Sequence, residues 1–354
     1  MKKIASLLVA FLFMAISATV LGAVTGIAPV YLFAGLTASS FIPMPSGVSM
    51  MAIQKEIWIN DIVANLFKAN PHLSHAVNAD AFVYNGKVVH IPNAGTKPLV
   101  TKNRSSYPAT VITRTDNDIT FSLDEFSSDP IKIANADKYE LSYDKRASVM
   151  GEQSAAIAET VGDWFYYYWA PSVSGSLLRT TGANVAAHIG TGTRKLITLA
   201  DVKQMAKAMD KQSIPQDGRY AALDADMYAQ FTDILSATQY RDFSASFDPA
   251  TGVVGKLFGF TFMQPRANVL NYNNASTPVV YDPATTPTAA TAMAAGLFWH
   301  QDSVIRALGQ NDFFEHIASP LYYGDIYSVL VRAGGRIRRN DAAGVIALVQ
   351  DLGV

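Results

Sequence analysis

Two histidines, His72 and His75, stand three residues apart, a spacing at which both imidazoles could bind one metal ion. No third ligand stands nearby in the sequence, and the pair follows the helix-breaking dipeptide Asn70-Pro71. The segment is therefore interpreted as a polar loop. The run Asp116-Asn117-Asp118 lacks the later glycine and the terminal glutamate of a calcium-binding loop, so we interpret it as a turn. The sequence assigns no metal ligand.

The loop Gly190-Thr191-Gly192-Thr193-Arg194-Lys195 precedes a predicted helix and superficially resembles a phosphate-binding loop. Its spacing departs from the Walker pattern, and no strand with a flanking acid is evident before it, so a flexible connection between subdomains is the simpler interpretation. The carboxylates Asp124-Glu125 fall in a predicted polar turn, and no G-x-S-x-G motif is present. We therefore predict no catalytic, cofactor-binding or metal-binding residue, no cofactor and no small-molecule substrate. The chain is not expected to be an enzyme.

Four arginines gather near the C-terminal end: Arg332, Arg336, Arg338 and Arg339. Two interpretations remain open, a contact with phosphate or DNA and ion pairing between subunits. Alternation along a strand would place these side chains on both faces, which favours ion pairing.

The composition restricts the class of protein further. Of 354 residues, 49% are hydrophobic and only 16% are charged, against a usual charged share of about 25%. Burial of apolar surface between subunits would explain this balance, and so would a membrane segment. The net charge of −1 gives no bulk positive field for nucleic acid. The absence of cysteine excludes disulfides and thiolate chemistry.

Residues 1–50 differ from the rest of the chain, because Lys2-Lys3 are their only charged residues. The apolar run Ile4–Val24 is long enough to span a bilayer and also suits a secretory signal. At Met50-Met51 the pattern changes to that of an amphipathic soluble protein. Three interpretations are open: a signal or anchor, a removable leader, and an upstream in-frame extension of a gene that starts at Met50 or Met51. We expect the last, because the sequence after Met51 reads as complete without it.

The elements predicted in the first half begin with a helix over Ile57–Lys68. Two short strands flank Asn85-Gly86, since Asn-Gly suits the type I′ turn of a hairpin. Two more β-branched strands, ATVITRT and ITFSL, flank the turn at Asp116–Asp118. Residues 81–123 are therefore predicted to form a long, projecting β excursion.

The clearest predicted helix runs from Ala136 to Trp169 and ends before Pro171. Its residues in a 3-4 stripe are Tyr143, Ala147, Met150, Ser154, Ile157, Val161, Trp164 and Tyr168. If it is helical from Glu140, it measures about 45 Å at about 1.5 Å per residue. Trp164 in this stripe is expected to be buried in the core.

The second half alternates helices and strands. Helices are predicted over three segments: Leu199–Met209, Ala225–Leu235 and Ser303–Leu308. Thr198 or Asp201 is expected near the cap of the first. Strands are predicted at RYAALD, FGFTFMQP, AGLFW, IYSVLVRA, RIRR and GVIALVQ, with Gly334-Gly335 interrupting the final meander. The Thr/Ala/Pro-rich stretch 271–294 is interpreted as an insertion or mobile loop.

This order of elements resembles the α+β fold of the major capsid proteins of tailed bacteriophages, the Hong Kong 97 type fold. Four segments carry the resemblance: ADKYELSYDKRASVMGEQSAAIAETVGDWFYYYWAP, RKLITLADVKQMAKAMDKQSIPQDGRYAALDADMYAQF, GKLFGFTFMQPRANV and YYGDIYSVLVRAGGRIRRNDAAGVIALVQD. The resemblance implies the following parts: 1–50, an apolar leader or upstream extension absent from the mature protein; 51–80, the N-terminal arm; 81–125, an extended β loop; 126–197, a peripheral domain with a spine helix over 140–169; 198–325, an axial domain with the insertion 271–294; and 326–354, returning C-terminal strands. Residues 1–50 depart from the family's pattern, since the scaffolding segments of some relatives are helical and charged.

The resemblance implies a structural coat protein that self-assembles, as hexamers and pentamers, into the icosahedral head enclosing phage DNA. Its implied partners are other copies of itself, portal and scaffolding proteins, and packaged DNA held by non-specific interior contacts. The implied location is the virion capsid, and the host cytoplasm during assembly. Two alternatives stay open: an encapsulin-type nanocompartment shell, and a membrane-anchored or secreted binding protein if residues 1–50 are retained.

Overall fold

The computed structural model describes residues 48–84, 87–93, 100–105, 107–108, 111, 117–134, 145–274 and 278–353. The chain divides into two compact units, Met1–Trp58 and Ile59–Val354. The apolar run Ile4–Val24 lies outside the described residues. None of the helices in the described ranges is both long enough and apolar enough to cross a bilayer.

Helix α3 (Val48–Ala69) is longer than the predicted Ile57–Lys68. It ends as expected at Asn70, whose side-chain amide donates to the carbonyls of Leu66 and Ala158 at 3.0 and 2.6 Å. The chain continues through the short 3-10 helix η1 (Pro71–His75) and strand β1 (Val77–Asn78) to a second 3-10 helix, η2 (Asp80–Phe82).

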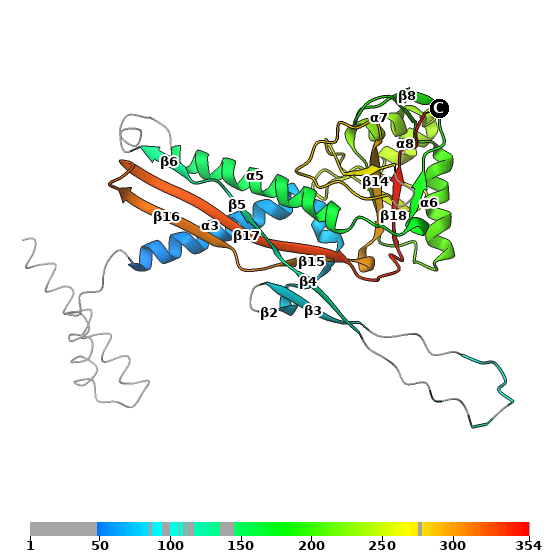
Figure 1. Ribbon diagram of the computed structural model, residues 1–354, viewed down its shortest axis with the longest axis horizontal. Coiled ribbons are helices and arrows are strands. Elements are labelled where there is room, and N and C mark those ends of the chain that lie inside the picture. Colours follow the sequence, from blue (N-terminus) through cyan, green and yellow to red (C-terminus); the bar gives the residue numbers. More distant parts are fainter. Residues whose placement is uncertain are drawn as a thin grey trace, which may run out of the picture. The chain divides into compact units, whose positions relative to one another are not determined.

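The first sheet is organised around one long strand, β17 (Gly324–Ile337). It pairs with four antiparallel strands: β15 (Val304–Leu308), β16 (Asp312–Ser319), β5 (Asp124–Ser127) and β6 (Ile131–Ala134). Strand β1 pairs in parallel with β15. Helix α5 (Lys145–Tyr168) runs alongside β17, as Figure 1 shows.

Two sequence predictions in this sheet are wrong. Of the helix predicted over Ser303–Leu308, residues Val304–Leu308 form strand β15 instead, because β17 supplies a full antiparallel partner to them. Strand β17 also runs through Gly334-Gly335 without interruption. A Cβ at Gly335 would stand 2.9 Å from the carbonyl oxygen of Ile305 and 3.0 Å from Nε1 of Trp169, so glycine permits close packing here rather than a turn.

The long helix predicted in the middle of the chain is confirmed over Lys145–Tyr168, while residues 135–144 lie outside the described part. The expected burial of Trp164 is wrong, since its side chain is half-buried and Phe165 and Trp169 are fully buried instead. A 3-4 stripe averages about 3.5 residues per turn, so it drifts by about 20° per heptad on a straight helix. The stripe is buried at Met150 and Ile157 and has rotated off the core by Trp164.

The predicted β excursion begins as a small sheet, in which β3 (Val88–Asn93) lies between β2 (Val83–Tyr84) and β4 (Asn117–Ser122). The hairpin expected at Asn85-Gly86 is confirmed by the pairing of β2 with β3, although these two residues are themselves outside the described ranges. Asn117 and Asp118 belong to β4, so the turn expected there is wrong. The strand predicted over ATVITRT lies outside the described residues, except for Val111.

The second sheet has the strand order β11-β12-β10-β14-β18-β7, with β13 also on β14. Its strands are β7 (Leu177–Arg179), β10 (Arg219–Ala222), β11 (Val253–Leu257), β12 (Phe260–Met263), β13 (Leu270–Asn273), β14 (Ala292–His300) and β18 (Val345–Val349). Helices α6 (Leu199–Lys211), α7 (Ala225–Asp233) and α8 (Ala237–Ser244) bury Met205, Phe231 and Phe243 against it in one core. The predicted cap of α6 is confirmed as a capping box of Thr198 and Asp201.

The stretch 271–294 is part of this sheet at both ends, which corrects its interpretation as an insertion. Strand β13 pairs antiparallel with β14, and Tyr272 is fully buried, with its hydroxyl donating to the carbonyl of Pro171 at 2.8 Å. Helix α8 and strand β16 were not predicted from the sequence.

Candidate functional site

Each of the two histidines considered as metal ligands stacks on a different tyrosine. The ring of His72 is 2% exposed and stacks on Tyr166, with 4.2 Å between centroids. The ring of His75 stacks on Tyr220 at 4.0 Å. Burial lowers the pKa of both rings, and the charge of Arg266 lowers that of His72 further. Both rings therefore pack as neutral aromatic groups, and the described residues contain no cluster of three potential metal ligands.

The loop considered as a phosphate cradle forms a hairpin of β8 (Asn184–Ala186) and β9 (Thr193–Lys195). The guanidinium of Arg194 is 1% exposed, and it donates to the carbonyls of Thr193, Ala290 and Ala292 at 2.7 to 3.1 Å. These bonds use the side chain to hold the approach to β14, so it is not available for a ligand.

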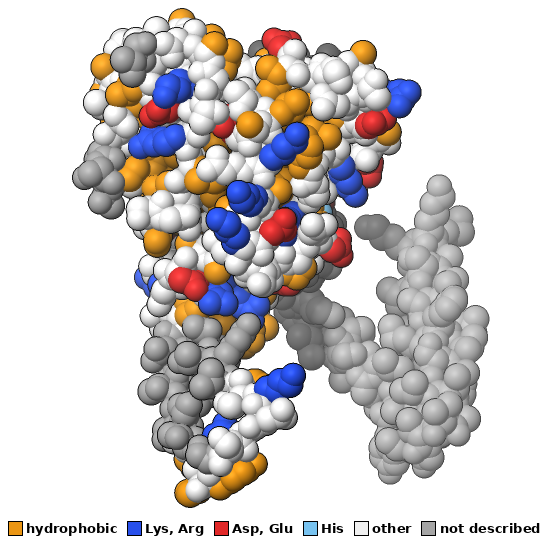
Figure 2. Space-filling model, turned by 90° about the vertical axis from the view of Figure 1, so that its right-hand side faces the viewer, with side chains coloured by type: hydrophobic (Ala, Val, Ile, Leu, Met, Phe, Trp, Pro, Cys, Tyr) orange, Lys and Arg blue, Asp and Glu red, His pale blue; other side chains and the backbone are white. Residues whose placement is uncertain are grey.

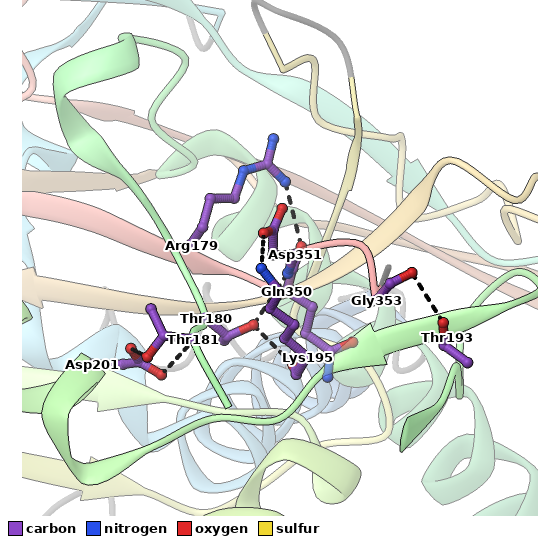
Figure 3. A network of polar contacts seen from close by, with 9 residues as sticks. All are labelled: Arg179, Thr180, Thr181, Thr193, Lys195, Asp201, Gln350, Asp351 and Gly353. Carbon is purple, nitrogen blue, oxygen red and sulfur yellow. Dashed lines mark hydrogen bonds and ion pairs between the residues drawn. The ribbon is translucent and has the colours of Figure 1, made fainter. Parts of the chain in front are cut away.

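Lys195 belongs to a polar network at the C-terminal end of the chain, drawn in Figure 3. Its ammonium pairs with Asp351 at 2.8 Å, and its carbonyl accepts from the Thr180 hydroxyl at 2.8 Å. Thr193 donates to the carbonyl of Gly353 at 3.1 Å. The network ties the chain end to β7 and β9.

The four arginines of the C-terminal cluster lie in or just after β17, and each has a partner in its own chain. Arg332 pairs with Glu125 at 3.1 Å, and Arg336 donates to the carbonyl of Thr120 at 3.0 Å. Arg338 donates to the carbonyl of Asp302 at 3.4 Å, and Arg339 pairs with Asp341 at 2.7 Å. Ion pairing between subunits stays a prediction.

The carboxylates Asp124-Glu125 lie in strand β5, which corrects their placement in a turn. The hydroxyl of Tyr168 donates to Asp124. Burial and this hydrogen bond raise the pKa of Tyr168 above its ordinary value. The pair links α5 to the sheet.

Besides these polar clusters, the described surface carries exposed large apolar side chains. The hairpin of β16 and β17 exposes Phe314 and Ile317 on β16, and its tip exposes Leu321, Tyr322 and Tyr323, with Leu321 80% and Tyr323 79% exposed. Large exposed apolar patches mark interaction sites rather than ordinary monomer surface. No residue from Ile317 to Gly324 is charged, so copies of the tip could approach one another without electrostatic repulsion.

A groove of about 380 Å³ lies between α5 and the β5–β6 segment. We call it the spine groove; its lining residues are Phe126, Ser127, Ser128, Asp129, Ile131, Glu152, Gln153, Ala156, Ile157 and Thr160. Gln153 is 4% exposed and donates through Nε2 to the carbonyls of Asp129 and Tyr327, both at 3.3 Å. Its Oε1 is buried with no hydrogen-bond partner within the described structure.

Sequence reasoning missed both surfaces. The hairpin tip carried a signal, the uninterrupted apolar run around Leu321-Tyr322-Tyr323, but no predicted element placed it at a turn. The sequence contained no signal for the spine groove, because Gln153 and Tyr327 are distant in sequence and meet only in the fold.

No protein-family model and no curated protein sequence matches the chain. Solved structures do match. The capsid of the cyanophage P-SCSP1u aligns with a TM-score of 0.53 at 18% identity over 77% of this chain and 86% of that one. The capsid of Ralstonia phage GP4 gives 0.57 at 12% identity, over 79% and 88%. The capsid of the native GTA particle gives 0.55 at 12% identity, over 81% and 91%.

These alignments cover most of both chains. The α+β class predicted from the sequence is confirmed. The chain has the Hong Kong 97 type fold of these phage capsid proteins.

Proposed function

We propose that this chain is the major capsid protein of a tailed bacteriophage and assembles into the icosahedral head. The single observation that carries the proposal is the fold, which aligns over most of its length with phage capsid chains. The surfaces agree with a role in contacts between subunits. The hairpin tip exposes large apolar side chains, and the polar clusters that could have suggested catalysis are engaged in internal bonds.

The proposal includes partners and location. Copies of the chain associate as hexamers and pentamers, with portal and scaffolding proteins as further partners. Packaged DNA touches the interior without sequence readout. The assembled protein lies in the virion capsid, and assembly takes place in the host cytoplasm. The domain division given above, from the N-terminal arm to the returning strands, belongs to the same proposal, except for the insertion 271–294, whose two ends are strands of the second sheet.

Expression of the chain with and without residues 1–50, followed by negative-stain electron microscopy, tests the proposal. Closed shells of uniform diameter are expected. Nucleic acid content separates a phage head from a protein-filled compartment shell, since particles from phage-infected cells should hold DNA. A monodisperse monomer at all concentrations would contradict the proposal.

A further inference from the structure

Helices α6, α7 and α8 pack into one hydrophobic core on the second sheet, and their outer surfaces differ in charge. The charged residues of α7 are Asp226 and Asp233, both acidic. In α8, Arg241 pairs with Asp242 at 3.1 Å, so the two charges cancel. Of these three helices, α6 has an excess of positive charge, because it contains three lysines and two aspartates.

The three lysines of α6 form one row along its exposed side: Lys203, Lys207 and Lys211, which we call the lysine row. Residues four apart lie on the same face of a helix, and each such step advances about 6 Å along its axis. All three side chains are exposed, and none takes part in an ion pair with a described residue. The ammonium of Lys203 lies 5.2 Å from the centroid of the Phe258 ring, a contact that brings no neutralising charge.

Both acidic residues of α6 are engaged within the chain. Asp201 is 2% exposed and accepts hydrogen bonds from the backbone amides of Thr181 and Thr198 and from the Thr181 hydroxyl. Asp210 pairs with Arg219 at 2.7 Å, and the side chain of Arg219 is buried. The two carboxylates therefore have partners of their own, and they do not cancel the charge of the lysine row at the surface.

The side chains beside the lysine row indicate what kind of partner it fits. Protein–protein interfaces are enriched in aromatic residues and arginine and depleted in lysine. No large hydrophobic side chain of α6 is exposed, and the exposed neighbour Gln204 is polar. Ammonium groups without an apolar anchor suit the phosphates of nucleic acid, which give affinity but carry no sequence information. Because the net charge of the chain is −1, such a contact has to be local.

We propose that the lysine row of α6 binds the phosphate backbone of double-stranded DNA without reading its sequence. The inference rests on the proposed function and names the part of the subunit that touches packaged DNA. In a closed shell the exposed side of α6 therefore faces the interior. Figure 2 views the molecule from the right-hand side of Figure 1, where α6 lies, and shows basic side chains on this face.

DNA binding by the full chain tests the lysine row. A fluorescent duplex of about 30 base pairs is titrated with free subunits, below the concentration at which shells form, and its anisotropy is measured. The variant with Lys203→Gln, Lys207→Gln and Lys211→Gln should bind at least about tenfold more weakly at low salt. Each phosphate contact adds about 0.9 to the slope of log affinity against log salt. Between about 50 and 200 mM salt, the affinity of wild type should therefore fall about 40-fold more than that of the variant. Unchanged affinity or an unchanged salt slope in the variant would overturn the inference.

Two matched variants separate this contact from other effects of charge. Arginine at all three positions of the lysine row keeps the charges and should bind DNA like wild type. The variant with Lys68→Gln, Lys87→Gln and Lys132→Gln removes the same number of exposed charges outside α6. It should also bind like wild type, and an equal loss of affinity in this control would show that net charge, and not the lysine row, holds the DNA.

Competition with polyglutamate distinguishes DNA from an acidic protein partner. Polyglutamate at the same concentration of negative charge should displace little of the duplex from wild-type subunits. Complete displacement, lost in the glutamine variant of the lysine row, would overturn the inference in favour of an acidic protein. Two duplexes of unrelated sequence should bind with equal affinity, and a clear preference for one of them would contradict binding through phosphates alone.

Intact particles give an independent readout of the face on which α6 lies. An amine-reactive reagent coupled to a protein too large to enter the shell should modify the lysine row in free subunits and spare it in particles, as mass spectrometry can show. Modification of the row in intact particles would place α6 outside and overturn the inference. The proposed function fails separately, if wild-type subunits form no shells, because DNA binding is measured on free subunits.

Discussion

The indole Nε1 of Trp169 donates a hydrogen bond to the backbone carbonyl of Ile305, with 2.9 Å between the two atoms. This bond joins the end of α5 to β15, across the place where β17 passes as Gly334-Gly335. The indole is fully buried, so the bond also satisfies a donor that would otherwise be orphaned. The junction of α5 and the first sheet thus depends on the indole of Trp169 and on the lack of a side chain at Gly335.

Gly335 should not tolerate a side chain. Gly335→Val places atoms within 3.0 Å of both Ile305 O and Trp169 Nε1, and overpacking of this kind costs about 1–3 kcal/mol. Urea denaturation of the subunit measures the loss. Gly151→Ala on α5 is the control, since no atom lies within 4 Å of its added Cβ; it should stabilise the helix by about 0.5–1 kcal/mol. Equal effects of the two changes would contradict this packing.

The two tryptophans of α5 should differ in their contribution to stability. Trp169→Ala removes a fully buried ring and its hydrogen bond, and should cost about 3–5 kcal/mol. Trp164 is half-buried beside Phe126 and Tyr167, so Trp164→Ala should cost about half as much. Thermal unfolding of the soluble variants gives the comparison. A larger loss of stability from Trp164→Ala than from Trp169→Ala would support the register of α5 in which Trp164 faces the core.

The sequence predicted several elements that local chemistry determines, but not α8, whose capping box of Ser236 and Gln239 is local as well. Thr198 and Asp201 indicate the start of α6 through their capping box, and the spacing of apolar residues in α5 predicts a long helix. Other errors fall where a partner distant in sequence determines the secondary structure. Val304–Leu308, for example, is a strand because β17 lies beside it. The Trp164 error has another origin, since the drift of a 3-4 stripe accumulates with helix length. The spine groove could not be predicted, because its lining comes from two segments that meet only in the fold.

His72 should make the subunit less stable in mild acid. Its pKa in the folded chain is lowered by burial and by Arg266, whereas in the unfolded chain it is near 6.5. The unfolded state therefore gains a proton first as the pH falls. The contribution is fully present above pH 6.5 and declines below it, by up to about 1.4 kcal/mol per pH unit.

His72→Phe keeps a ring against Tyr166 and removes the titration. Its unfolding free energy should therefore fall less steeply than that of wild type between pH 6.5 and pH 5. Urea denaturation across this range checks the difference. The same slope in both proteins would show that another group carries the acid sensitivity.

Removal of residues 94–116, here called the extension, should separate folding from assembly, and the structure shows which residues can be deleted. A deletion of residues 85–120 would remove Val89 and Ile119, which are 0% and 4% exposed, and would damage the core that includes Leu123 and Ile305. Asn93 and Asn117 face each other across β3 and β4. Residues 94–116 can therefore be replaced by a two-residue Asn-Gly turn without changing the register of the hairpin.

The shortened subunit should keep the thermal stability and circular dichroism of wild type, because no buried residue of the described core is lost. It should elute as free subunits in size-exclusion chromatography, because residues 94–116 are expected to contact a neighbouring subunit. Intact shells from this variant would show that the extension is dispensable for assembly, and an unfolded chain would show that it supports the fold itself.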